Sequence, residues 1–329
     1  MKAKIDEKLF VELGGVRQRI HIRSLDETKP VLLFLHGGPG VCNRHSILHD
    51  HEDLMDSFTL VGWDQRGTGG SYYGVPEESL TVDRVVEDAR ELVEWLCKRF
   101  EKDKIFIIGG SWGSELGTYL ANRHPEHLAA FVGFGQVVDI AENERISYEF
   151  TLEEARKADC AEDVAALEKV GPPVMGCYKG GHDGMMVQRN ILMKYGGYSK
   201  DAKKRSYASA MVWPILKSGE YSLRDLYGLI KGYKRVLVAM WEEVGRTNFK
   251  RDCTKFEIPV YIFDGVLDNN TPAVLVQDWY DMIEAPDKCL IWFENSGHNP
   301  MGDEGDRFKK LLREKLGAVR EKESGSFRI

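Results

Sequence analysis

The stretch Gly109-Gly110-Ser111-Trp112-Gly113 decides the fold of this chain. It directly follows a largely apolar run at 104–108 and precedes a helical pattern, so it joins a strand to a helix through a sharp turn. Glycine at both ends suits such a turn, because its backbone angles are strained and the strand and helix approach closely. The pattern predicts that Ser111 stands exposed at the upper edge of a sheet, where it can act as a nucleophile.

A glycine-rich turn between a strand and a helix can also be a plain connection or a phosphate cradle. The phosphate alternative is weak, because the turn carries neither a GxxxxGK[ST] nor a GxGxxG pattern and the Trp112 side chain would crowd a phosphate. The rest of the sequence therefore has to supply a base, an acid and donors for an oxyanion.

A second glycine-rich loop lies upstream. The buried-strand run at 30–35 ends in His36-Gly37-Gly38-Pro39-Gly40. Such a loop exposes backbone N–H groups, and we expect the amides of Gly38 and Trp112 to form an oxyanion hole. An ordinary strand-to-helix loop is the simpler alternative. We expect His36 to brace this loop rather than to act as the base.

An acid and a base follow two later strand runs. The run at 259–263 leads into a turn-rich loop with Asp264 and Asp268, and the run at 289–293 leads into a loop with His298. Serine, acid and histidine thus come in the order Ser111, Asp268, His298, each on a loop after its own strand. Taken singly, Asp268 can be a turn former and His298 a surface histidine. Asp264 is the reserve acid.

Together these segments resemble the proline iminopeptidase family of α/β hydrolases. The resemblance is carried by the motifs at 36–40, 63–71 and 109–114 and by the segments Gly265-Val266-Leu267-Asp268 and Gly297-His298. It implies a serine hydrolase that releases an N-terminal residue, often proline, from short peptides. Carried over by position, it implies Ser111 as the nucleophile, Asp268 as the orienting acid and His298 as the base.

Hydrophobic patterns predict an α/β fold with a mainly parallel sheet flanked by helices. Strand runs alternate with amphipathic helices up to residue 136, and a hairpin turning at Gly14-Gly15 opens the chain. From 137 to 250 the pattern is helical, and strands resume only near 259. We therefore expect an α/β-hydrolase core over 1–136 and 251–329, with an inserted helical cap over 137–250 that shapes the substrate pocket.

Aminopeptidases of this family hold the free amino group of the substrate with cap-domain glutamates. Glu242 and Glu243 are the nearest candidates for that substrate-binding role, although a solvated helix face is the simpler reading of this pair. Glu115 departs from the family pattern, because a small neutral residue is more usual just after the elbow. It could favour the positive N-terminal end of the following helix.

Composition is typical of an ordinary soluble enzyme, and the family resemblance implies a small molecule or short peptide as its substrate. The chain has 329 residues, of which 43% are hydrophobic, and a net charge of −7 that disfavours nucleic acid or an anionic membrane as main partner. The N-terminus shows neither a signal peptide nor a membrane span, so we expect a cytoplasmic protein with six reduced cysteines. No cofactor is expected, and the oligomeric state stays open.

Three alternatives remain. The segment His49-Asp50-His51-Glu52-Asp53 superficially spells the start of a metallo-hydrolase site, but Leu54 stands where a further histidine would be, and we expect no metal. The same triad could serve an esterase, lactonase or amidase of small acyl substrates. A non-catalytic binding protein on this scaffold is the third alternative, although it usually lacks a triad member.

Overall fold

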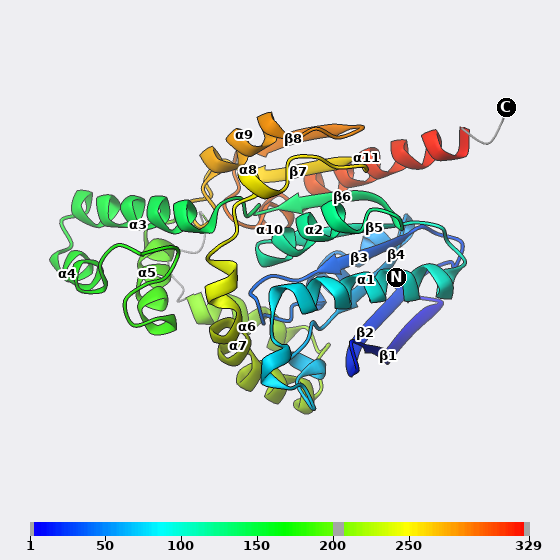
Figure 1. The fold of residues 1–329 in the computed structure, drawn as a ribbon, viewed down its shortest axis with the longest axis horizontal. Coiled ribbons are helices and arrows are strands. Elements are labelled where there is room, and N and C mark those ends of the chain that lie inside the picture. Colours follow the sequence, from blue (N-terminus) through cyan, green and yellow to red (C-terminus); the bar gives the residue numbers. More distant parts are fainter. Residues whose placement is uncertain (1–2, 200–206, 326–329) are drawn as a thin grey trace.

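The computed structural model describes residues 3–199 and 207–325. Its sheet has eight strands in the order β1-β2-β4-β3-β5-β6-β7-β8 (Figure 1). The strands are β1 (Ile5–Leu13), β2 (Val16–Ser24), β3 (Val31–Leu35), β4 (Thr59–Trp63), β5 (Ile105–Gly110), β6 (Leu128–Phe134), β7 (Val260–Gly265) and β8 (Lys288–Phe293). Strands β1 and β2 form an antiparallel hairpin, and β2 pairs antiparallel with β4. The other neighbouring strands pair in parallel. The predicted mainly parallel sheet is confirmed.

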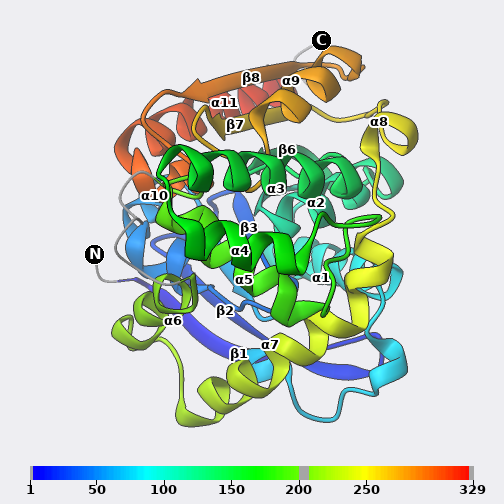
Figure 2. The ribbon, with the colours of Figure 1, turned by 90° about the vertical axis from the view of Figure 1, so that its left-hand side faces the viewer.

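Helices cover the sheet, and six further helices lie between β6 and β7 in the sequence of the described residues (Figures 1 and 2). The helices of the sheet region are α1 (Val82–Phe100), α2 (Trp112–Arg123), α9 (Ala273–Met282), α10 (Pro300–Asp303) and α11 (Gly305–Gly325). Those of the inserted cap are α3 (Ile140–Lys157), α4 (Ala161–Val170), α5 (His182–Lys194), α6 (Tyr207–Lys217), α7 (Leu223–Val244) and α8 (Phe249–Asp252). Within the described ranges, no helix is long and apolar enough to cross a bilayer.

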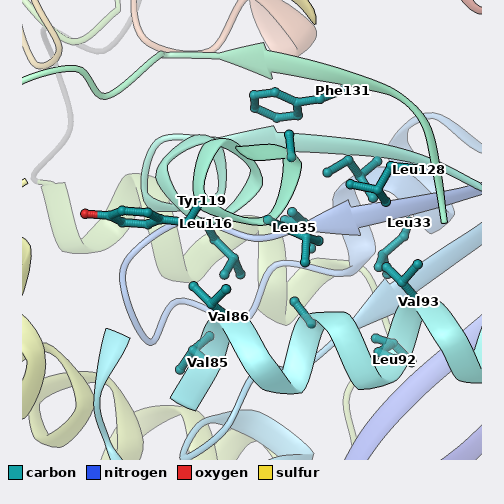
Figure 3. Close-up of a cluster of buried hydrophobic side chains, with 14 of the residues drawn as sticks. Leu33, Leu35, Val85, Val86, Leu92, Val93, Leu116, Tyr119, Leu128 and Phe131 are labelled. Carbon is teal, nitrogen blue, oxygen red and sulfur yellow. The ribbon is translucent and has the colours of Figure 1, made fainter. Parts of the chain in front are cut away.

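Helices pack on both faces of the sheet and bury them. Alternate side chains of a strand point to opposite faces, so each central strand contributes to two hydrophobic clusters. In β3, Leu33 and Leu35 pack into the cluster that holds α1 and α2. Figure 3 shows both side chains beside those of α1. Leu32 and Phe34 join the opposite cluster, which includes residues of α11. The central strands are therefore apolar throughout, as parallel strands covered on both faces must be.

The turn between β5 and α2 has the strained geometry that its sequence predicts. Ser111 has a φ of 56°, a conformation that side chains rarely adopt. A Cβ atom on Gly109 would lie 2.1 Å from the Gly113 carbonyl oxygen, and one on Gly113 would lie 1.9 Å from the Leu35 carbonyl oxygen. Both glycines are therefore required for the strand and helix to pack this closely.

Replacing Gly113 by alanine is expected to lower the free energy of unfolding by about 3 kcal/mol or more, because the new methyl group meets β3 backbone and not a movable side chain. Urea unfolding followed by circular dichroism measures the change. Gly317→Ala on α11 is the matched control: nothing lies within 4 Å of its added Cβ, so a gain of up to about 1 kcal/mol is expected. Equal effects of the two substitutions would contradict the close packing described for Gly113.

The cap is attached to the core through a close helix contact. Gly228 and Gly232 lie one turn apart on α7. Cβ atoms on them would lie 2.0 Å from the Gly69 carbonyl oxygen and 2.2 Å from that of Gly67. The backbone of α7 thus rests directly on the 67–69 loop after β4. This contact sets the height of the cap over the carboxyl ends of the strands.

Candidate active site

The loop after β3 lies directly against Ser111. A Cβ atom on Gly37 would be 3.3 Å from the Ser111 Cβ. Gly38 has a φ of 125°, and a side chain there would come within 2.5 Å of the Gly40 nitrogen. Trp112 opens α2, and the first amides of a helix have no acceptor within it. Gly38, Ser111 and Trp112 line one pocket, an arrangement that suits two amides serving one oxyanion.

Gln65 holds this loop and the elbow together. Its side-chain amide donates to the His36 carbonyl oxygen at 3.0 Å, and its Oε1 accepts from the Trp112 indole at 2.8 Å. His36 accepts the Gln65 backbone N–H at Nε2 (3.1 Å) and donates from Nδ1 to the Gly37 carbonyl oxygen (2.9 Å). Burial lowers the pKa of His36 to about 4, so the ring is neutral at pH 7. The expectation that His36 braces the loop is confirmed.

Asp268 and His298 are in direct contact, although 30 residues separate them. His298 Nδ1 lies 2.8 Å from Asp268 Oδ2. The carboxylate also accepts the backbone amides of Asn270 and Thr271 at 2.8 and 2.9 Å and the Thr271 hydroxyl at 2.6 Å. These donors stabilise the charged carboxylate and fix its orientation toward the ring.

The second ring nitrogen of His298 is available as a base. With Nδ1–H donating to Asp268, Nε2 carries the lone pair, and it accepts from the Asn270 side-chain amide at 3.3 Å. The Tyr198 ring lies 4.8 Å from the imidazole, centroid to centroid, and the Tyr198 carbonyl accepts the His298 backbone N–H at 2.7 Å. His298 and Ser111 line a common pocket with Gly38. Base and nucleophile therefore face the same space.

Asp264, the reserve acid, has a different environment. Its two oxygens accept the backbone amides of Gly135 and Gln136 at 2.8 and 3.2 Å, and the side chain is fully buried. Burial and the nearby charge of Asp268 raise the pKa of Asp264. Gly135 in turn packs against His298, since a Cβ there would lie 2.9 Å from a ring carbon. Asp264 thus supports the backbone beside the ring.

On the cap side of Ser111 lies a pocket of about 610 Å³ that is lined by residues of α2, α3, α5 and α7. This volume suits a small ligand. Two buried glutamates line it together with Ser111: Glu115 from α2 and Glu144 from α3. The rest of the lining is mixed. Its apolar side chains are Val137, Ile140, Met185, Met186, Leu237, Trp241 and Val244, and its polar side chains are Asn143, Arg189, Tyr233, Asn270 and Thr271.

The two cap glutamates predicted to bind substrate are not among the residues that line this pocket. Glu242 is exposed and forms an ion pair with Arg246 just beyond the end of the same helix. Glu243 accepts the Val82 backbone N–H at 2.8 Å and so caps the start of α1. The prediction that Glu242 and Glu243 bind substrate is therefore wrong, because α7 directs Glu242 to solvent and Glu243 to α1.

The histidine-rich segment before β4 contributes to packing. His49 Nε2 lies 2.9 Å from Glu220 Oε2, and His51 is buried beside the start of α11 at Gly305. Among the residues that the structure describes, no group of three or more His, Cys, Asp or Glu side chains could hold a metal ion.

Several residues of this site had no decisive signal in the sequence. Asn270 and Thr271 follow Asp268 at turn spacing, and an Asx-type turn could have been read from Asp268-Asn269-Asn270-Thr271. Gln65 lies inside a recognised motif, but its bridging role depends on two distant loops. Glu144 lies in an amphipathic helix among other glutamates, and only the fold distinguishes it from them.

Known proteins resemble this chain in sequence and in fold. Residues 30–160 match the family model described as the alpha/beta hydrolase fold. The chain is 28% identical to a probable aminopeptidase of Bacillus subtilis over 92% of this chain and 93% of that protein. It is 24% identical to a proline iminopeptidase of Clostridioides difficile over 89% of this chain and 91% of that protein.

A solved structure of a proline iminopeptidase-related protein from Thermus thermophilus superposes with a TM-score of 0.64 at 18% identity. The superposition covers 96% of this chain and 98% of that one, and at this identity it demonstrates the shared fold. The family model and the two relatives above agree with the resemblance that the motifs indicate.

Proposed function

Since this chain is an α/β hydrolase related to the proline iminopeptidases, we propose that it is a serine aminopeptidase that releases N-terminal residues from short peptides. The observation that carries the proposal is the composition of the pocket. Two buried carboxyl side chains, Glu115 and Glu144, share that pocket with Ser111. Arg189, which lines the same pocket, compensates the charge of Glu144, whereas a buried carboxyl group without such a partner, as at Glu115, favours a cationic group such as a free amine.

The proposed reaction is acyl transfer. His298 Nε2 removes the proton from Ser111, whose oxygen attacks the substrate carbonyl. The amides of Gly38 and Trp112 stabilise the tetrahedral oxyanion, and protonated His298 then returns the proton to the leaving amine. Water repeats the attack on the acyl-enzyme. Asp268 keeps the proton of neutral His298 on Nδ1 and stabilises the imidazolium.

The cap supports an exopeptidase of small substrates. Helix α3 contributes Ile140, Asn143 and Glu144 to the pocket, and α7 contributes Tyr233 and Trp241. A partly apolar pocket with carboxyl groups suits one N-terminal side chain together with its amine.

An amine-blocked substrate is expected to lose roughly 10²-fold in kcat/KM relative to the free amine, because it cannot form the buried ammonium–carboxylate pair, whose loss costs about 2–5 kcal/mol. Initial rates with Pro-arylamide, Ala-arylamide and acetyl-Pro-arylamide measure this loss. A short-chain ester without an amine serves as the control for an intact Ser111 reaction.

The second candidate is an esterase, lactonase or amidase of small acyl substrates, and the apolar walls around Met185 and Trp241 favour it. It predicts that the short-chain ester or acetyl-Pro-arylamide is turned over better than the free-amine arylamides. That result would replace the aminopeptidase proposal while keeping the acyl-transfer chemistry.

A further inference from the structure

Glu115 is a buried carboxyl group close to the nucleophile. It follows Ser111 by four residues in the first turn of α2, and its backbone N–H donates to the Ser111 carbonyl oxygen at 3.2 Å. Its side chain is almost fully buried, and its Oε1 accepts the Thr247 hydroxyl at 2.7 Å. Its Oε2 is buried and has no hydrogen-bond partner among the described residues. Glu115 lines the pocket.

Glu144 differs from Glu115 in its charge balance. Its Oε1 accepts from the buried Arg189 guanidinium, so the two opposite charges compensate each other. Glu144 Oε2 is buried without a partner in the described part of the chain and can still accept a hydrogen bond. No ion pair to Glu115 is found within residues 3–199 and 207–325. Glu115 is thus the group whose negative charge would be uncompensated.

We propose that Glu115 supplies the charge that pairs with the protonated amine of the substrate, and that it releases its own proton to solvent as the amine enters. The Glu144–Arg189 ion pair carries no net charge and contributes one hydrogen-bond acceptor to the pocket, Glu144 Oε2. The atoms balance simply: a carboxylic acid and an ammonium ion give a carboxylate–ammonium pair and one solvated proton. This inference rests on the proposed function, because it names the group that selects an amine next to the scissile carbonyl.

The surroundings of Glu115 explain why the empty pocket holds the neutral acid. Burial raises the pKa of Glu115 to about 8, and the Thr247 hydroxyl only partly opposes this. The titratable and charged groups that face it are Tyr119 on its own helix, whose hydroxyl lies 3.0 Å from that of Thr247, and the Glu144–Arg189 pair across the pocket. An incoming ammonium is the missing opposite charge, and it would favour the ionised form.

The geometry also fits the chemistry of an aminoacyl group. When Ser111 is bonded to the carbonyl carbon, the α-amino nitrogen is two bonds farther on. Glu115, which lies one turn after Ser111 in the chain and lines the same pocket, is the carboxyl group placed to meet that nitrogen. Primary and secondary α-amines both carry a positive charge and at least one N–H, so alanine-like and proline-like N-termini belong to the same substrate class.

Pyrrolidine is a suitable probe, because its ammonium form persists from pH 6 to 9 and it has no carbonyl to react. Calorimetric titration of the wild-type chain in two buffers of different ionisation enthalpy, at pH 7, is expected to show about one proton released per pyrrolidine bound. The dissociation constant should rise about tenfold for each pH unit below 8 and level off above it, because cation binding needs the ionised carboxyl.

Substitutions of the pocket glutamates identify the residue that releases the proton on pyrrolidine binding. In Glu115→Gln, we expect weaker binding that no longer changes with pH and no proton release. Glu242→Gln, at an exposed glutamate, should behave like the wild type. The proposal is overturned if the wild-type chain does not bind pyrrolidine or binds it without releasing a proton. It is equally overturned if Glu115→Gln keeps the pH dependence while Glu144→Gln loses it. The wild-type measurement does not depend on the folding of any variant.

These outcomes are independent of the proposed hydrolase activity. Repeating the titration with Ser111→Ala should give the same proton release, since the amine site does not use the serine hydroxyl. Absence of peptidase turnover together with normal pyrrolidine binding would reject the aminopeptidase activity and leave the amine site in place. Turnover of free-amine arylamides without proton release on pyrrolidine binding would keep the aminopeptidase activity and reject the role of Glu115.

Discussion

Replacing Ser111 by alanine is expected to reduce kcat by about 10⁶-fold on any substrate of this protein, to the level left by oxyanion donors and binding alone. The reason is that the acyl-enzyme cannot form without the hydroxyl at the strained turn, where φ is 56°. Steady-state rates and labelling by a fluorophosphonate probe measure the loss.

Ser46→Ala is the matched control, because Ser46 lines the same pocket as Ser111 and His298. We expect it to keep both labelling and turnover. Retention of labelling in Ser111→Ala, or its loss in Ser46→Ala, would mean that the nucleophile is a different residue.

Replacing Asp268 by asparagine is expected to lower kcat by about 10⁴-fold with little change in fold, because an amide does not hold the His298 proton on Nδ1. The contact at stake is the 2.8 Å pair between Asp268 Oδ2 and His298 Nδ1. Steady-state rates measured across pH, together with the unfolding midpoint of the variant, test this expectation.

Asp264→Asn provides the comparison at the same loop. Asp264 accepts two backbone amides, whereas asparagine has one acceptor oxygen, so we expect a loss of about 1–3 kcal/mol in the free energy of unfolding and a much smaller loss of turnover. If Asp264→Asn abolished turnover and Asp268→Asn did not, the assignment of the acid would be wrong.

The predictability of the site differs from residue to residue. The Asp268 and His298 positions follow from chain order and from loops after strands, and the structure brings the two into contact. The residues that hydrogen-bond to the site depend on side-chain directions, which the hydrophobic periodicity of the sequence does not reveal. Asn270 at His298 Nε2 and Gln65 between His36 and Trp112 are examples.

The carboxyl groups of the pocket show where prediction from sequence fails. Glu242 and Glu243 are the nearest candidates for the cap glutamates that the family resemblance implies, but α7 directs one to solvent and the other to Val82. In the sequence, Glu115 is only a departure from the family pattern after the elbow. Its significance arises from burial, which a single sequence does not report for a charged residue at a helix N-terminus.

The sequence by itself determined the mainly parallel sheet, the sharp turn at Ser111 and the glycine-rich loop after β3. Each depends on interactions within a short window: apolar alternation, glycine at a strained turn, and a loop at a strand end. Only the tertiary structure decided which carboxyl groups share the pocket with the nucleophile. Glu115 meets Thr247 across 132 residues of sequence, and Glu144 meets Arg189 across 45. Such contacts set burial and charge compensation, and both depend on how distant helices pack.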